Sequence, residues 1–147
     1  GILYEYTDGT TQYDEIEDPL PFDLNAPVVE IQDDDYALFY RDITEEPKKY
    51  NGKTVRFKAQ VARLKKEREG YFAPGRFVMT CCEADIAYNP LVCVFDQPTT
   101  LKTRDWVTLT GKIRVEKNRF YRTAGPVLYV TATDFATPPV QEVATFY

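Results

Sequence analysis

Residues 54–61 read TVRFKAQV, and apolar and polar side chains alternate through them without a break. The apolar set is Val55, Phe57, Ala59 and Val61. Because successive side chains of a strand point to opposite faces of a sheet, this alternation predicts a strand with one face in a core and the other in solvent. It is the most regular pattern in the chain, and the fold class that we expect depends on it.

Further strand candidates lie on both sides of this one. Four follow it, at residues 71–82, 91–95, 106–115 and 127–133, and a short one precedes it at residues 28–31. Five main strands at this spacing predict a mainly β fold, a small five-stranded antiparallel barrel similar to the oligonucleotide/oligosaccharide-binding (OB) fold. A two-sheet sandwich is the alternative, because strand patterns alone rarely distinguish the two architectures.

One short helix is expected before the first barrel strand. Tyr36, Phe39, Tyr40 and Ile43 are spaced by three or four residues, which places them on one stripe of a helix. Three aspartates directly before Tyr36 favour a helix start, because carboxylates there interact with free backbone N–H groups and with the helix dipole. Pro47 ends the helix, which we expect to cover one end or side of the barrel.

Charge divides the chain into an acidic beginning and a basic body. Residues 1–40 carry eleven acids and no base, whereas residues 41–147 carry twelve acids and eighteen bases. Residues 1–27 lack periodicity and are read as an extended or disordered lead-in, followed by the OB-like domain at residues 28–147. The lead-in either keeps the chain soluble or lies over a basic surface and masks it.

The composition excludes several classes of function. The 147 residues suffice for one domain with a core, and no apolar run is long enough to insert into a membrane. The chain has no histidine and no serine, which removes the commonest proton shuttle and the commonest hydroxyl nucleophile. We therefore expect a protein without enzymatic activity. Because the chain begins with Gly1 rather than Met, we expect it to be a piece of a longer protein.

The block RFVMTCCEAD at residues 76–85 is the richest in chemistry. Cys81, Cys82 and Asp85 offer two thiolates and a carboxylate, which are ligands that zinc accepts. Adjacent strand residues point to opposite faces, so both cysteines reach one ion only if the chain turns at Cys82. The alternatives are a cysteine buried for packing and a disulfide between this pair and Cys93 on the next strand.

Arg76, at the start of the same block, is a further candidate site residue. Its guanidinium could lower the pKa of a neighbouring thiol or bind an anion. The interpretation that we favour is a strand-edge residue that forms a salt bridge, with Asp85 as the expected partner.

Two basic loops predict a different class of function. In an OB fold, the loop between the first two strands and the loop between the last two flank the binding face. Basic residues interleaved with aromatic ones suit single-stranded nucleic acid or another polyanion, although the acidic lead-in and the net charge of −5 make nucleic acid the less favoured ligand. The residues concerned are Arg63, Lys65, Lys66, Arg68, Lys117, Arg119, Phe120, Tyr121 and Arg122.

Six segments of the chain carry a resemblance to a known family. They are VVEI at 28–31, EEPKKYNGKTVRFKAQV at 45–61, RFVMTCCEAD at 76–85, DWVTLTGKI at 105–113, GPVLYV at 125–130 and ATFY at 144–147. These segments resemble the C-terminal soluble domain of the YcgQ family, bacterial membrane proteins that accompany a predicted permease. The cysteine block is the specific part, and it departs from the family pattern after Asp85, where this chain reads IAYNPL.

The resemblance implies a function as well as a fold. It implies an OB-like domain that follows N-terminal membrane helices and lies outside the cytoplasm, with a membrane permease as partner. An association with zinc handling has been proposed for the permeases, so zinc is the implied metal. The residues that the resemblance carries over are Arg76, Cys81, Cys82 and Asp85, without Cys93.

Overall fold

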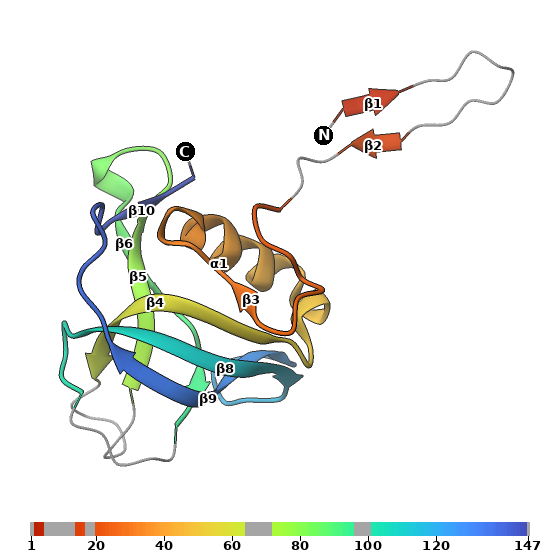
Figure 1. Ribbon diagram of the computed structural model, residues 1–147. Helices are drawn as coiled ribbons and strands as arrows, with labels where there is room; N and C mark the ends of the chain where they lie inside the picture. Colours follow the sequence, from red (N-terminus) through yellow and green to blue (C-terminus); the bar gives the residue numbers. More distant parts are fainter. Residues whose placement is uncertain (1, 5–13, 17–19, 64–71, 96–100, 147) are drawn as a thin grey trace, which may run out of the picture.

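The computed structural model describes residues 2–4, 14–16, 20–63, 72–95 and 101–146. Ten strands, one α-helix and three short 3₁₀ turns follow one another along these ranges (Figure 1). The strands are β1 (Ile2–Tyr4), β2 (Asp14–Ile16), β3 (Val29–Glu30), β4 (Thr54–Arg63), β5 (Phe72–Met79), β6 (Ala87–Pro90), β7 (Cys93–Val94), β8 (Trp106–Glu116), β9 (Gly125–Phe135) and β10 (Ala144–Thr145). The helix is α1 (Tyr36–Glu45), and the 3₁₀ turns are η1 (Asp33–Asp35), η2 (Pro47–Tyr50) and η3 (Glu83–Asp85).

The first strand expected from the alternating pattern is β4, and its core face is the predicted one. Val55, Phe57, Ala59 and Val61 are all buried. Along the facing strand β8, residues such as Leu109 are buried in the same way, since β4 and β8 pair antiparallel over seven residue pairs. This pair forms the wall onto which the rest of the domain packs.

The expectation of a five-stranded antiparallel barrel was wrong in strand number and direction, although the mainly β class with one short helix is confirmed. Eight strands form one sheet with the path β10-β5-β4-β8-β9-β7, while β3 adds to β4 and β6 adds to β5. The pairs β3·β4, β10·β5 and β7·β9 are parallel. These extra strands are two to four residues long, too short for a periodic pattern to reveal them.

One short segment of the chain adds a strand to β5 and another to β9, on opposite sides of the central pair β4·β8. Residues 87–90 form β6 on β5, and residues 93–94 form β7 on β9. The described strands of the domain therefore form a single barrel-like wall rather than the two stacked sheets of a sandwich (Figure 1). The separate antiparallel pair β1·β2 lies in the acidic lead-in, and the division of the chain at residue 27 stays a prediction.

Helix α1 lies over this wall and closes the core with aromatic side chains (Figure 1). Phe39 is fully buried and contacts the rings of Phe22, Tyr36, Tyr50 and Phe57 at centroid distances of 5.6 to 6.2 Å. Burying one such ring contributes about 1.5–3 kcal/mol, and each well-placed aromatic pair adds about 0.5–1.5 kcal/mol. The predicted helical stripe is thus confirmed. The core of the domain also includes Phe22, a residue of the expected lead-in whose exposed fraction is 8%.

The hairpin of β5 and β6 is held at unusually close range. A Cβ added to Gly75 would lie 2.4 Å from the backbone oxygen of Asn89 and 2.5 Å from the Cα of Pro90. Gly75 pairs with Pro90 in the ladder, so only a residue without a side chain lets the two strands approach this closely. This tight hairpin carries the cysteine pair at its tip.

None of the helices in the described ranges combines the length and apolar character needed to cross a membrane.

Candidate metal centre

The cysteine pair lies in a turn, not in a strand. We expected a strand as far as Cys82, but β5 ends at Met79. The chain then passes through Cys82 in an extended conformation, with φ −154° and ψ 168°, into the 3₁₀ turn η3. We call residues 80–86 the metal turn. The turn after Cys82 that a shared metal ion requires is therefore present, at the place where the sequence suggested it.

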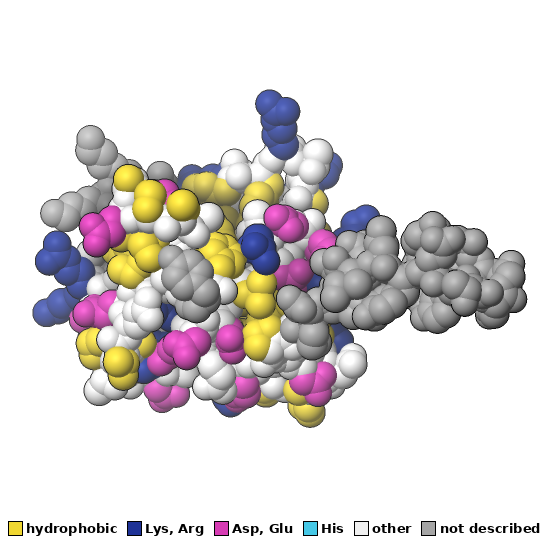
Figure 2. All heavy atoms as spheres, turned by 90° about the horizontal axis from the view of Figure 1, so that it is seen from above, with side chains coloured by type: hydrophobic (Ala, Val, Ile, Leu, Met, Phe, Trp, Pro, Cys, Tyr) yellow, Lys and Arg dark blue, Asp and Glu magenta, His cyan; other side chains and the backbone are white. Residues whose placement is uncertain are grey.

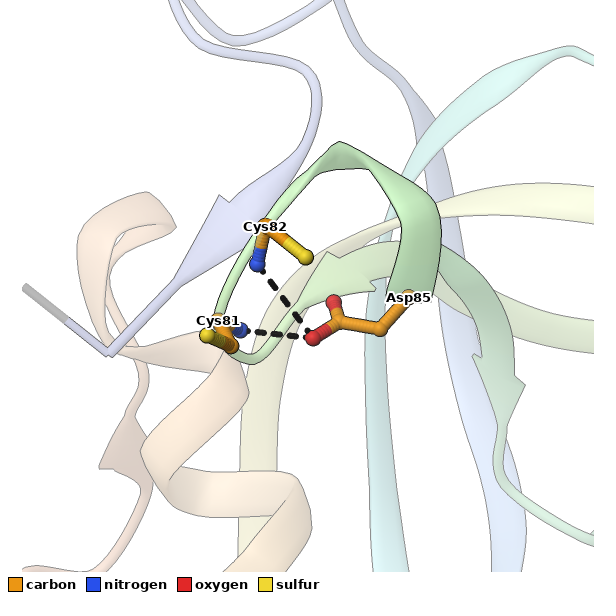
Figure 3. Close-up of side chains that lie close together, drawn as sticks. All are labelled: Cys81, Cys82 and Asp85. Atoms are coloured by element: carbon orange, nitrogen blue, oxygen red, sulfur yellow. Dashed lines mark hydrogen bonds between the residues drawn. The ribbon is translucent and has the colours of Figure 1, made fainter.

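Asp85 organises the metal turn through backbone hydrogen bonds. Its Oδ1 accepts the N–H of Thr80 at 2.8 Å. Its Oδ2 accepts the N–H groups of Cys81 at 2.8 Å and Cys82 at 3.3 Å (Figure 3). These bonds satisfy three donors that would otherwise be left free where β5 stops. They draw Asp85 toward the two cysteines from three or four residues further along the chain.

The same hydrogen bonds keep Asp85 charged. The N–H of Thr80 has the largest effect on the pKa of the Asp85 carboxyl and lowers it. Desolvation opposes this effect, and the N–H groups of Cys81 and Cys82 lower the pKa further, so the net shift is downward. Since the pKa in the folded state lies below that in the unfolded state, this stabilisation is present above the ordinary carboxyl pKa. It is lost as the pH falls through the folded value. Asp85 is therefore a carboxylate at neutral pH.

Three ligand atoms converge in this turn. One Sγ each from Cys81 and Cys82 and one carboxylate oxygen of Asp85 all lie within 4.8 Å of one another. Both cysteines are exposed, and Figure 3 shows the three side chains around the bend of the hairpin. Tetrahedral zinc with Zn–S of about 2.3 Å and Zn–O of about 2.0 Å needs ligand atoms roughly 3.5–3.8 Å apart. The turn is thus within about 1 Å of a zinc-binding geometry, a distance that side-chain rotation can supply.

Cys93 is separate from this group. It lies in β7, is 6% exposed, and its burial raises the pKa of its thiol to about 12. None of the three cysteines forms a disulfide in the structure, so the disulfide alternative is not what the structure shows. Cys93 fits the packing role that a buried cysteine usually has.

The burial difference predicts how the thiols react. In the native protein treated with a chelator to remove any metal, two thiols per chain should react readily with 5,5′-dithiobis(2-nitrobenzoic acid), because Cys81 and Cys82 are exposed. Cys93 should react only after unfolding, since it is buried and protonated at neutral pH. A Cys93→Ala variant is the control: its native count should stay at two, and its count in denaturant should fall from three to two. Rapid reaction of three thiols in the native wild type would contradict this placement.

We expected Arg76 to be a strand-edge residue in a salt bridge with Asp85, but the structure places it in the interior with other partners. It is 1% exposed, and its Nη1 donates a hydrogen bond to the backbone oxygen of Asp33 at 2.6 Å. Its Nη2 donates to the backbone oxygens of Gln141 at 2.7 Å and Glu142 at 3.1 Å. Arg76 therefore binds two distant parts of the chain to β5. It is a structural residue and not a ligand of the metal turn.

The surroundings of Arg76 explain how a charge is tolerated there. Its guanidinium lies 5.9 Å from the ring centre of Tyr36 and 5.7 Å from that of Trp106. Burial lowers the pKa of Arg76, and the charge of Asp33 is the largest opposing influence. Among the described residues, its Nε has no hydrogen-bond partner. On β5, Arg76 and Val78 are buried and Phe77 between them is exposed, so Arg76 lies on the inner face of the strand. A charged residue in phase with buried apolar ones was the sequence signal for a buried, hydrogen-bonded arginine, and we did not predict it.

The structure describes only some of the residues of the two basic loops. Lys65, Lys66 and Arg68 lie outside the described residues, and Arg63 Nε donates to the backbone oxygen of Leu101 at 2.7 Å. In the β8–β9 hairpin, Lys117, Arg119, Phe120 and Arg122 are exposed, whereas the Tyr121 hydroxyl donates to the backbone oxygen of Pro126.

No continuous basic surface appears on the face drawn in Figure 2. Acidic and basic side chains are interspersed there with hydrophobic ones. A polyanion needs a groove or patch of one sign of charge along its backbone. Polyanion binding therefore stays a prediction from the sequence.

Comparison with known proteins places the chain in a family. Residues 6–143 match the family model of the DUF1980 C-terminal domain. No curated protein and no solved structure matches the chain. Since the matched segment covers nearly all of the 147 residues, the chain belongs to the DUF1980 C-terminal domain family.

Proposed function

We propose that this domain binds a thiophilic divalent metal ion, zinc in the first place, through Cys81, Cys82 and Asp85. The observation that carries the proposal is the convergence of their three ligand atoms within 4.8 Å on one exposed turn. Two thiolates and a carboxylate make a ligand set that zinc accepts. In this proposal the domain binds the ion without catalysing a reaction.

The hydrogen bonds of Asp85 are compatible with a role as ligand. A carboxylate offers about four lone-pair positions, and the three backbone N–H groups occupy only part of them. Asp85 would hold the turn and contact the ion at the same time. Metal binding to Cys81 and Cys82 would release thiol protons, so the affinity should fall as the pH is lowered.

The proposed setting is a membrane-anchored protein that acts as an accessory of a permease, with this domain outside the cytoplasm. The support for this setting is the resemblance of six segments, above all residues 76–85, to the YcgQ family. The absence of histidine and serine from the chain supports a non-enzymatic role, since it leaves few side chains for acid–base or nucleophilic catalysis. A metal-binding accessory domain then fits a transport system whose substrate is the same metal.

The test of metal binding uses the wild-type domain, purified without chelator. We expect stoichiometric zinc by elemental analysis, and both exposed thiols should be protected from alkylation until the zinc is removed with a chelator. Replacing zinc by cobalt(II) should give a thiolate-to-cobalt charge-transfer absorption in the near ultraviolet. A protein that stays free of metal when zinc is offered, with both exposed thiols reactive throughout, would rule the proposal out.

A further inference from the structure

The metal turn supplies three ligands from five consecutive residues. Among the described residues, the group of Cys81, Cys82 and Asp85 gains no fourth cysteine or acidic side chain. Histidine is absent from the whole chain, so the most common additional ligand is not available. Structural zinc sites are normally closed by four protein ligands, whereas a site with three keeps one position open. An ion held here therefore has a coordination position that the domain itself does not fill.

Contacts within the chain hold the metal turn and the core. Asp85 already closes the turn through its backbone hydrogen bonds to Thr80, Cys81 and Cys82. The core lies elsewhere, around α1 and the buried face of β4. A site whose loop is held in shape without the metal is suited to binding and releasing it, because neither step requires the domain to fold or unfold.

The metal turn lies at the exposed end of the β5–β6 hairpin. Cys81 and Cys82 are exposed, and so are two apolar neighbours on the β5–β6 hairpin. Ile86, directly after Asp85, is 38% exposed, and Phe77, packed against Tyr88 at 5.2 Å, is 44% exposed. Apolar side chains beside a polar site are what a contact with another protein usually requires.

We propose that the metal turn is an exchange site, at which a thiolate or imidazole of another protein takes the open coordination position and removes the ion. This inference rests on the proposed function, because it assumes that the turn binds metal. The occupant of the surface around Ile86 and Phe77 is then a protein that presents a metal-ligating side chain. The open coordination position requires that side chain to be a metal ligand, a thiolate or an imidazole.

The exchange is a ligand substitution without a redox step. The incoming thiol gives its proton to solvent as its sulfur bonds to the ion, or an imidazole binds through its neutral nitrogen. A bond from the ion to Cys81 or Cys82 then breaks, and the released thiolate takes a proton from solvent. The ion keeps its charge of +2 throughout. The second cysteine and Asp85 are displaced as further donor side chains of the same protein bond to the ion, and Asp85 leaves as a carboxylate without taking a proton.

The experiment uses the domain loaded with cobalt(II), whose visible absorption reports its ligands. Imidazole and 2-mercaptoethanol are titrated in separately, and each should shift the visible bands in a saturable way as it takes the open position. With zinc-loaded protein and the chelator 4-(2-pyridylazo)resorcinol, the release rate should rise in proportion to chelator concentration, because the chelator attacks the bound ion. Glu83→Gln, an exposed change on the same turn outside the proposed ligand set, is the matched control and should behave like the wild type.

The possible failures are distinguishable. If cobalt and zinc do not bind, the proposed function fails, and the exchange site fails with it. If both bind with thiolate absorption but neither added ligand changes the spectrum, and zinc release does not depend on chelator concentration, the site is closed. That second result overturns the exchange inference and leaves metal binding intact. A response to only one of the two added ligands would support the inference and identify the donor as a thiolate or an imidazole.

Discussion

Replacing Arg76 by methionine should lower the free energy of unfolding by about 3–5 kcal/mol. Methionine roughly fills the space but donates no hydrogen bond, so the backbone oxygens of Asp33, Gln141 and Glu142 lose the guanidinium that they bind. Each hydrogen bond to a charged group contributes about 1.5–3 kcal/mol, and methionine loses all three of them. The effect should be among the largest that a single substitution produces in this domain.

Urea unfolding followed by fluorescence measures this change. Trp106 is the only tryptophan, it is buried, and its ring lies beside Arg76, so its emission reports the region directly. Arg114→Met is the matched control, because Arg114 is an exposed arginine that lies over the ring of Tyr129 at 5.7 Å. The control should change stability by no more than about 0.5 kcal/mol. Equal stabilities of the two variants would show that Arg76 does not hold the chain as described.

Substitution of either exposed cysteine should abolish stoichiometric zinc binding. In Cys81→Ser or Cys82→Ser the site keeps two of its three ligands, and the zinc affinity should fall by more than about 100-fold. Removing a residue that only hydrogen-bonds to a metal ligand already lowers metal affinity by about 10–100-fold, and the loss of a ligand itself should cost more. Because both residues are exposed, the free energy of unfolding of the metal-free protein should stay near that of the wild type. Competition with a chromophoric chelator gives the affinities, and denaturation gives the stabilities.

Two further variants locate the effect. Cys93→Ala should leave zinc affinity unchanged but lower stability by about 1 kcal/mol, because Cys93 packs in the core and not in the metal turn. Asp85→Asn should reduce zinc affinity by about 10–100-fold, since the amide is neutral and one of its groups is a donor that opposes the backbone N–H groups. If Cys93→Ala lost the metal while Cys81→Ser kept it, the metal centre would have been assigned to the wrong cysteines.

Local patterns predicted the parts of the fold that depend on local periodicity. The alternation around Phe57 became β4, and the stripe that begins at Tyr36 became α1, because a long run of side chains must share one buried face. Pairings between distant short segments were not predictable in this way. The parallel addition of β10 to β5 joins residues 144–145 to residues 78–79, and nothing in either segment reports on the other.

The residue types predicted the members of the candidate site, but not the hydrogen bonds that hold them in place. The sequence identified Cys81, Cys82 and Asp85 as a possible ligand set and the turn that they need, and the structure places their ligand atoms together. It did not show that Asp85 would bind three backbone N–H groups, because that depends on where β5 ends. The partners of Arg76 lie 43 to 66 residues away in the chain, beyond the reach of any local pattern.

The contacts of Arg76 also set the order in which the domain is completed during synthesis. A ribosome delivers Asp33 and Arg76 long before Gln141 and Glu142, and the guanidinium on the emerging β5 lacks two of its three acceptors until then. Until residues 141–142 and β10 have left the exit tunnel, an unfinished chain therefore exposes the guanidinium of Arg76, which is buried in the folded domain, and the unpaired end of β5. Nascent chains whose residues 141–145 have not yet emerged from the tunnel should be open to proteases and chaperones, and the emergence of these residues should complete the barrel in one late step.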